Sequence, residues 1–81
     1  MEVQLFAQLR EAAGANSVSV STVPDTVAAL REKIAAEGTP ELREALEDPN
    51  VFCAVNKKVV GDDHPVADGD EVGFFPPMTG G

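Results

Sequence analysis

The sequence contains no tryptophan and no tyrosine, and its 81 residues include one cysteine, one histidine and six basic residues. A single cysteine cannot form a disulfide within the chain, which favours a reducing compartment, so we expect a cytoplasmic protein. Fourteen acidic residues give a formal net charge of -8, and an acidic surface repels nucleic-acid phosphates. No apolar run approaches the roughly 20 residues of a membrane-spanning helix. We therefore expect neither a nucleic-acid partner nor a membrane partner.

Catalytic and metal-binding signatures are also missing. The sequence has no glycine-rich phosphate loop, and its serine, histidine and aspartate residues show no pairing typical of a catalytic triad. The acidic segment 62–71, which includes His64, matches neither the spacing of an EF-hand nor that of a zinc site. Cys53 lies in an apolar run, where a free cysteine usually behaves as a small buried hydrophobe. One domain of this size buries only about 60% of its unfolded surface and has little room for a deep pocket. We expect no self-contained active site, no metal, and no cofactor bound by the chain itself.

Apolar spacing predicts one main helix in the middle of the chain. Either Asp25 or Thr26 can cap its N-terminal end, and Gly38 is expected to end it in the left-handed conformation. The apolar residues recur at intervals of three and four and leave one apolar stripe, which should lie on a sheet. That stripe is formed by Val27, Leu30 and Ile34.

A short second helix and five strands complete the expected elements. Thr39 caps the second helix, Pro40 suits its first position and Pro49 ends the segment. Alternating or apolar β-rich segments predict strands at residues 3–6, 18–20, 51–56, 57–60 and 71–75. The first two strands form a hairpin, with a turn at residues 14–16 and room for a longer connection from residue 7. Further turns are predicted at residues 56–57 and 68–69.

This order of elements predicts an α+β fold of two layers, with a mixed sheet packed on one main helix. It matches the β-grasp, or ubiquitin-like, topology. We expect residues 1–75 to form the β-grasp domain and residues 76–81 to form an extended C-terminal Gly-Gly tail.

The C-terminal tail is the most unusual stretch. Pro76 and Pro77 stop the last strand, because proline lacks a backbone donor and has a fixed φ. Gly80 and Gly81 carry no side chains and end in a free carboxylate. Six residues reach at most about 20 Å. Such a tail can enter a narrow channel and bring its last carboxylate to the catalytic groups of another protein.

Apolar doublets form a second signal. Neighbouring residues in a strand point to opposite faces of the sheet, and the predicted helix covers only one face. One member of each doublet should therefore be buried and the other left on the outer face, where together they form an apolar patch that suggests a partner. The doublets are Leu5-Phe6, Val59-Val60 and Phe74-Phe75.

The segments FAQLREAAG and DGDEVGFFPPMTGG, together with the length between them, resemble the MoaD/ThiS family of sulfur carriers, and in particular the small subunits of molybdopterin synthase. The resemblance implies that an adenylating enzyme similar to ubiquitin-activating enzymes uses ATP and magnesium to convert the Gly81 carboxylate to an acyl-adenylate. A sulfur donor protein then displaces AMP and leaves a thiocarboxylate. The large catalytic subunit of molybdopterin synthase accepts the tail, and sulfur passes to cyclic pyranopterin monophosphate to build the dithiolene.

The same resemblance assigns roles to individual residues. It implies that Thr79 and Gly80 thread the channel of the partner and that Gly81 carries the sulfur. It implies an assembly of two small and two large subunits, with the large subunits at the centre. The residues expected to contact a partner are Phe6, Arg10, Val59, Phe75, Pro76, Pro77 and Met78.

Other functions fit the same tail. The chain could carry sulfur for another pathway, such as thiamin synthesis or tRNA thiolation. It could be a ubiquitin-like modifier that joins Gly81 to lysines of target proteins, since one acyl-adenylate serves both fates. A plain interaction module with an inert tail is the third alternative, and deletion of Gly81 would leave its function intact.

Overall fold

The computed structural model of the chain describes residues 1–21, 24–48 and 50–76. Within these ranges it contains five strands and three helices. They are β1 (Glu2–Leu5), α1 (Gln8–Ala13), β2 (Ser17–Ser19), α2 (Val27–Glu37), α3 (Pro40–Leu46), β3 (Phe52–Val55), β4 (Lys58–Val60) and β5 (Val72–Phe75).

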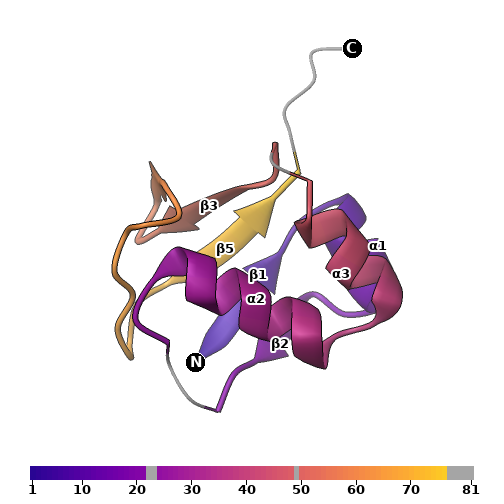
Figure 1. Cartoon of the computed structure of the whole chain (residues 1–81), viewed down its shortest axis with the longest axis horizontal. Helices are drawn as coiled ribbons and strands as arrows, with labels where there is room; N and C mark the ends of the chain where they lie inside the picture. Colours follow the sequence, from indigo (N-terminus) through magenta and orange to yellow (C-terminus); the bar gives the residue numbers. More distant parts are fainter. Residues whose placement is uncertain (22–23, 49, 77–81) are drawn as a thin grey trace.

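The strands form one mixed sheet in the order β2-β1-β5-β3-β4. The central pair, β1 and β5, is parallel, and the other three pairs are antiparallel. Helix α2 crosses one face of this sheet, and α1 and α3 lie beside each other at one end (Figure 1). The predicted mixed sheet, packed on one main helix and a short second one, is confirmed.

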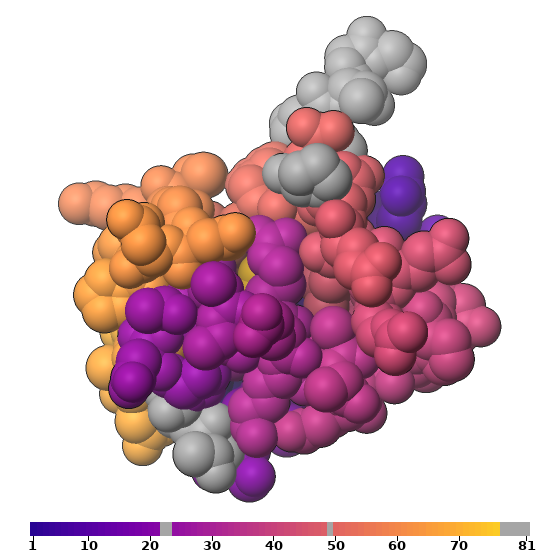
Figure 2. Space-filling view, in the orientation of Figure 1, coloured from indigo at the N-terminus to yellow at the C-terminus, as the bar shows by residue number. Residues whose placement is uncertain are grey.

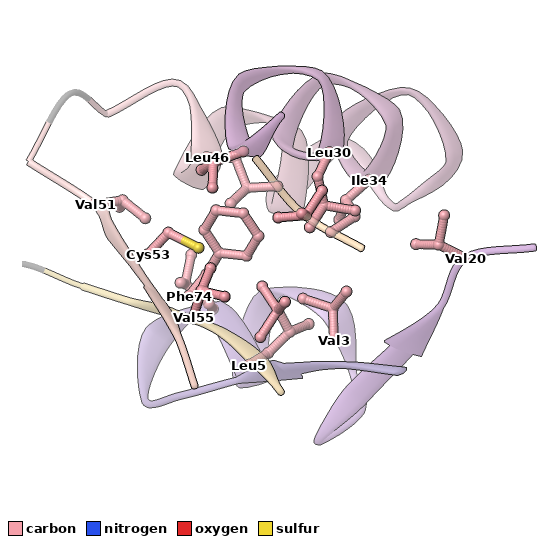
Figure 3. Packing of buried hydrophobic residues seen from close by; sticks show 14 of the residues in the cluster. Val3, Leu5, Val20, Leu30, Ile34, Leu46, Val51, Cys53, Val55 and Phe74 are labelled. Atoms are coloured by element: carbon pink, nitrogen blue, oxygen red, sulfur yellow. The ribbon is translucent and has the colours of Figure 1, made fainter. Parts of the chain in front are cut away.

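The hydrophobic core fills the space between the sheet and the helices. Val3, Leu5 and Phe74 point from the sheet toward Leu30 and Ile34 of α2 (Figure 3), and each of these side chains is at most 3% exposed. In the space-filling view α2 and α3 cover this side of the sheet (Figure 2). Among the described residues, the helices therefore pack against this face of the sheet and not against the opposite one.

Threonine side chains begin both of the predicted helices. The Oγ1 of Thr26 accepts a hydrogen bond from the Ala29 amide at 3.3 Å, so Thr26 rather than Asp25 is the cap of α2. The Oγ1 of Thr39 accepts from the Leu42 amide at 3.1 Å and donates to the Ala12 carbonyl at 2.8 Å. The second threonine therefore starts α3 and also ties it to α1.

Gly38 follows α2, as predicted, but the left-handed conformation predicted for it is wrong. Gly38 has φ -91°, which is not left-handed. A Cβ at this position would lie 2.9 Å from both the Ile34 carbonyl oxygen and the Leu42 Cδ2. Glycine is needed here for space between α2 and α3, not for its backbone freedom. A left-handed glycine does end α1, at Gly14 with φ 73°.

Helix α1 was not predicted. The pairing of β1 with β2 is antiparallel, as expected of a hairpin, but the connection contains a helix of six residues. Leu9 of this helix is 1% exposed, and Ala12 and Ala13 pack against the core. These two alanines follow Leu9 by three and four residues, which is the spacing of a helix. The pattern is weak in the sequence because only one of the three side chains is large and fully buried.

Arg31 closes the core where α2, α3 and β3 meet. Its guanidinium donates to the carbonyl oxygens of Leu46 at 3.3 Å and Val51 at 3.0 Å, and it pairs with Asp62 at 3.1 Å. The same group lies 5.3 Å from the centre of the Phe74 ring, a distance at which a cation is attracted to an aromatic face. One side chain thus connects three segments of the chain.

Candidate docking face and the start of the C-terminal tail

The apolar doublets at the centre of the sheet divide between its two faces. Leu5 is 2% exposed and Phe74 is fully buried, whereas Phe6 is 41% exposed and Phe75 is half-buried. The inner members face the helices and the outer members face away from them. The predicted division of these two doublets is confirmed.

The third doublet lies in the edge strand β4. Val59 is 68% exposed, the higher value of the two exposed large hydrophobic residues found among residues 1–21, 24–48 and 50–76. Val60 is half-buried and packs against the core. The register places Val59 opposite Ala54 of β3, which in turn lies opposite Gly73 of β5. Val59 therefore belongs to the outer face, as predicted.

Three phenylalanine rings stack across the outer face. The rings of Phe6 and Phe75 are 4.4 Å apart between centres and lie within 4° of parallel. The ring of Phe52 stacks on the other side of Phe75 at 5.3 Å and 12°. We call these three residues the aromatic row. An ordered apolar surface of this kind, on a sheet face that no helix covers, is typical of a protein interaction site.

Phe52 is the member of the aromatic row that the sequence analysis missed. It follows Val51 and precedes Cys53, both of which are buried. Strict alternation within β3 would have placed Phe52 on the outer face, opposite Phe75 in the register. The signal was present but hidden, because the whole segment is apolar and does not alternate in polarity.

A strained turn positions Phe6. The chain leaves β1 at Ala7, which has φ 52° and ψ -122°, a conformation that L-residues other than glycine rarely adopt. The Phe6 amide donates to the Phe74 carbonyl at 3.3 Å, and the Phe6 carbonyl accepts from the Leu9 amide at 3.1 Å. Phe6 is thereby held beside β5 while the chain turns at once into α1.

Arg10 lies on α1, whose first residue comes two positions after Phe6, and it is exposed. Its carbonyl oxygen accepts from the amides of Gly14 and Ala15 at the end of the helix. A contact between its guanidinium and a partner stays a prediction.

The start of the tail lies beside α1 and α3. Strand β5 ends at Phe75, and Pro76 is half-buried in a shallow depression that Gln8 and the acidic residues Glu41 and Glu44 also line. The remaining predicted tail and partner residues lie outside the described part of the chain. These are Pro77, Met78, Thr79, Gly80 and Gly81. The division into residues 1–75 and 76–81 and the roles of these residues therefore stay predictions.

Two titratable groups of the described residues have pKa values shifted from their usual ones, Cys53 and Asp70. Burial raises the pKa of the Cys53 thiol to about 11, so the reactive thiolate is scarce at neutral pH. A hydrogen bond from Asn56, and to a smaller extent one from the Ala67 amide, lowers the pKa of the Asp70 carboxyl. The Nδ1 of His64 lies 2.7 Å from the Pro65 carbonyl oxygen. Within the described ranges no group of three or more His, Cys, Asp or Glu side chains could hold a metal ion.

No helix in the described part of the chain is long and apolar enough to cross a membrane. The described residues thus present an apolar candidate docking face and, at Pro76, the point where the C-terminal segment leaves the sheet.

Comparison with known proteins agrees with this geometry. Residues 3–81 match the ThiS family. The chain belongs to the ThiS family. It is 47% identical to the molybdopterin synthase sulfur carrier subunit of Escherichia coli, over 100% of this chain and 99% of that protein. It is 36% identical to the molybdopterin synthase sulfur carrier subunit of Haemophilus influenzae, again over 100% and 99% of the two chains.

A solved structure similar to this chain has the same fold. The crystal structure of the small archaeal modifier protein 1 of Haloferax volcanii is 32% identical and covers 95% of each chain, with a TM-score of 0.74. The predicted β-grasp fold and the predicted resemblance to this family are both confirmed.

Proposed function

We propose that this chain is the sulfur carrier subunit of a molybdopterin synthase and works in the cytoplasm. The observation that carries the proposal is the 47% identity, over the full length of both chains, to a relative that bears that name. The terminal Gly80-Gly81 sequence supplies the carboxylate that the function requires.

The proposed chemistry takes place at the carboxylate of Gly81. An adenylating enzyme transfers AMP from magnesium-bound ATP to this carboxylate and releases pyrophosphate. The sulfur of a donor at the oxidation level of sulfide attacks the acyl carbon and expels AMP, which leaves a thiocarboxylate. In the large catalytic subunit that sulfur forms a bond to a carbon of cyclic pyranopterin monophosphate and displaces an oxygen substituent from it. Water then cleaves the resulting thioester, which leaves the sulfur on the pterin and restores the Gly81 carboxylate. Two such transfers complete the dithiolene.

The outer face of the sheet is the proposed docking surface for these partners. Phe6, Phe75 and Val59 were expected there by resemblance, and Phe52 extends the surface along the aromatic row. Covering exposed apolar area stabilises a complex by about 25 cal/mol for each Å² removed from water, before the costs of association. Docking on this face leaves the tail, which begins at Pro76 directly after Phe75, free to enter the partner. Thr79 and Gly80 then thread its channel, and Pro77 and Met78 line the entrance.

The decisive experiment measures the intact mass of the protein after incubation with the adenylating enzyme, ATP, magnesium and a sulfide source. We expect a gain equal to the replacement of one oxygen by sulfur. The variant without Gly81 should show no gain and should melt at the same temperature as the wild type. Met78→Leu is the matched control, because it keeps both the bulk of the tail and its two glycines. Absence of the gain with an enzyme that is active on another carrier would overturn the proposal.

A second candidate function is that of a ubiquitin-like modifier. It is favoured by the similarity to a structure named a small archaeal modifier protein. A modifier would form isopeptide bonds between Gly81 and lysines of other proteins. Mass spectrometry of tagged protein recovered from cells under denaturing conditions distinguishes the two functions. Conjugates that vanish on deletion of Gly81 would support the modifier, and a free chain with a thiocarboxylate supports the sulfur carrier.

A further inference from the structure

The outer face of the sheet contains a hollow beside the aromatic row. Its floor is made of Gly73 of β5 and Ala54 of β3, the smallest residues of these two strands, and the rings of Phe6 and Phe75 form one wall. Charged side chains of opposite sign stand at its rim. We call it the Gly73 hollow, and its principal lining residues are Gly73, Ala54, Phe6, Phe75, Lys57 and Glu71.

The absence of a side chain at residue 73 makes this shape possible. Gly73 is buried although it lies on the face that no helix covers. A Cβ on Gly73 would lie 2.9 Å from Cε2 of Phe6 and 3.6 Å from Cε1 of Phe75. The two rings therefore lean over the backbone of β5, and they leave an open space toward Ala54, which lies opposite Gly73 in the register.

The size of the hollow suits one apolar side chain. Its volume is about 170 Å³, and an engineered cavity of roughly 150 Å³ in another protein holds a benzene molecule. The floor and the ring wall offer no charged group. A charged occupant would lose its hydration without gaining a partner, whereas a leucine, methionine or phenylalanine side chain would gain contacts on several sides.

We propose that the Gly73 hollow receives one apolar side chain of the large catalytic subunit when the carrier docks. This inference rests on the proposed function and refines it. By resemblance, Phe6, Val59 and Phe75 were expected to form a hydrophobic docking surface. Here the carrier also accepts an anchor from the partner, at a point continuous with the aromatic row. Such buried central anchors usually dominate the binding energy of an interface. Lys57 and Glu71 at the rim are placed to bond polar groups that flank the anchor.

The test compares two variants that add the same side chain to the same face. Ala54→Val fills the floor of the hollow, and valine is favoured in strands, so the fold should be retained. Ser19→Val places the same side chain on β2, at an exposed position outside the hollow, and removes the hydroxyl that donates to Glu2. Calorimetric titration with the large subunit of the same organism should show at least roughly tenfold weaker binding for Ala54→Val. Ser19→Val should bind like the wild type.

Gly73→Ala fills the hollow from a second strand and replaces Ala54→Val if that variant fails to fold. Its Cβ must displace the Phe6 ring, which is partly exposed and can turn outward. Wild-type affinity in a folded Ala54→Val or Gly73→Ala protein would overturn the hollow as a binding site. If Phe75→Ala still weakened binding in that case, the docking face would stand without the hollow. A wild-type carrier that does not bind the large subunit would overturn both proposals.

Discussion

The two faces of this sheet are built from the same strands but differ in the burial of their side chains. On the inner face Leu5, Phe74 and Cys53 are at most 2% exposed and form the core with the helices. Their neighbours along the chain form the aromatic row on the outer face. A side chain that stays exposed after folding gains little from folding. The inner residues are therefore explained by stability, while the ordered outer rings call for another cause, which we take to be binding.

The substitution of neighbouring phenylalanines gives the largest expected contrast. Phe74→Ala removes a fully buried ring and should lower the free energy of unfolding by about 3–5 kcal/mol. Phe75→Ala removes a half-buried ring from the outer face and should cost roughly 1 kcal/mol, because little apolar area is re-exposed. Urea denaturation of the two variants and the wild type measures both values.

Binding should reverse this order. Folded Phe75→Ala protein should bind the large subunit at least roughly tenfold more weakly, as expected for an aromatic anchor. Any Phe74→Ala protein that remains folded should bind nearly as well as the wild type. A loss of several kcal/mol of stability in Phe75→Ala, with unchanged binding by the folded fraction, would make Phe75 a core residue and remove the contrast.

Much of this arrangement was predictable from the sequence, for a physical reason. Val27, Leu30 and Ile34 repeat with the helical period. The apolar doublets interrupt the alternation of apolar and polar residues that is typical of a strand with one exposed face. Both patterns depend only on local geometry. Helix α1 and the role of Gly38 depend on how close two helices approach, and spacing alone does not contain that information.

Cys53 provides a pH-dependent probe of the inner face. Burial raises its pKa from the usual value of 9.0 to about 11 in the folded state. A raised pKa means that the folded protein holds the proton more tightly than the unfolded chain. The resulting stability is present in full below pH 9 and is lost as the pH rises through about 11. Two pKa units correspond to about 2–3 kcal/mol.

The measurement is the free energy of unfolding between pH 8 and the alkaline end of the stable range, on the order of pH 11. Cys53→Ala should be less stable at pH 8, but it should not show the part of the loss of stability at alkaline pH that comes from ionisation of the Cys53 thiol. As a contrast, Ala54→Cys in the Cys53→Ala background places a thiol on the outer face of the same strand. That thiol should react with a thiol reagent at pH 8 far faster than Cys53 does. Equal rates would mean that the two faces are not distinguished by burial.

The proposed docking face was predictable in part. Phe6, Val59 and Phe75 came from the doublets and the resemblance, but Phe52 and Gly73 did not. Phe52 escaped because β3 is apolar on both faces, so its sequence does not show which residues point outward. The importance of Gly73 appears only when the rings of two neighbouring strands are seen to meet above it. Such cross-strand contacts depend on register, which was not assigned from the sequence.

The smallest expected effect is at Ala7, where the chain passes from Phe6 on the outer face to Leu9 in the core. Its φ of 52° costs a non-glycine residue on the order of 1–3 kcal/mol. Glycine would relieve this strain, but part of the stability gained would be lost because glycine makes the unfolded chain more flexible. Ala7→Gly should therefore stabilise the protein by about 1 kcal/mol. Ala13→Gly, at a helical position of α1, should instead destabilise it by about 0.5–1 kcal/mol. Thermal melting of both variants tests the opposite signs.

If Ala7→Gly also weakens binding to the large subunit, the strained residue holds the Phe6 ring in place for docking. Unchanged binding would mean that the strain serves only the tight passage from β1 into α1.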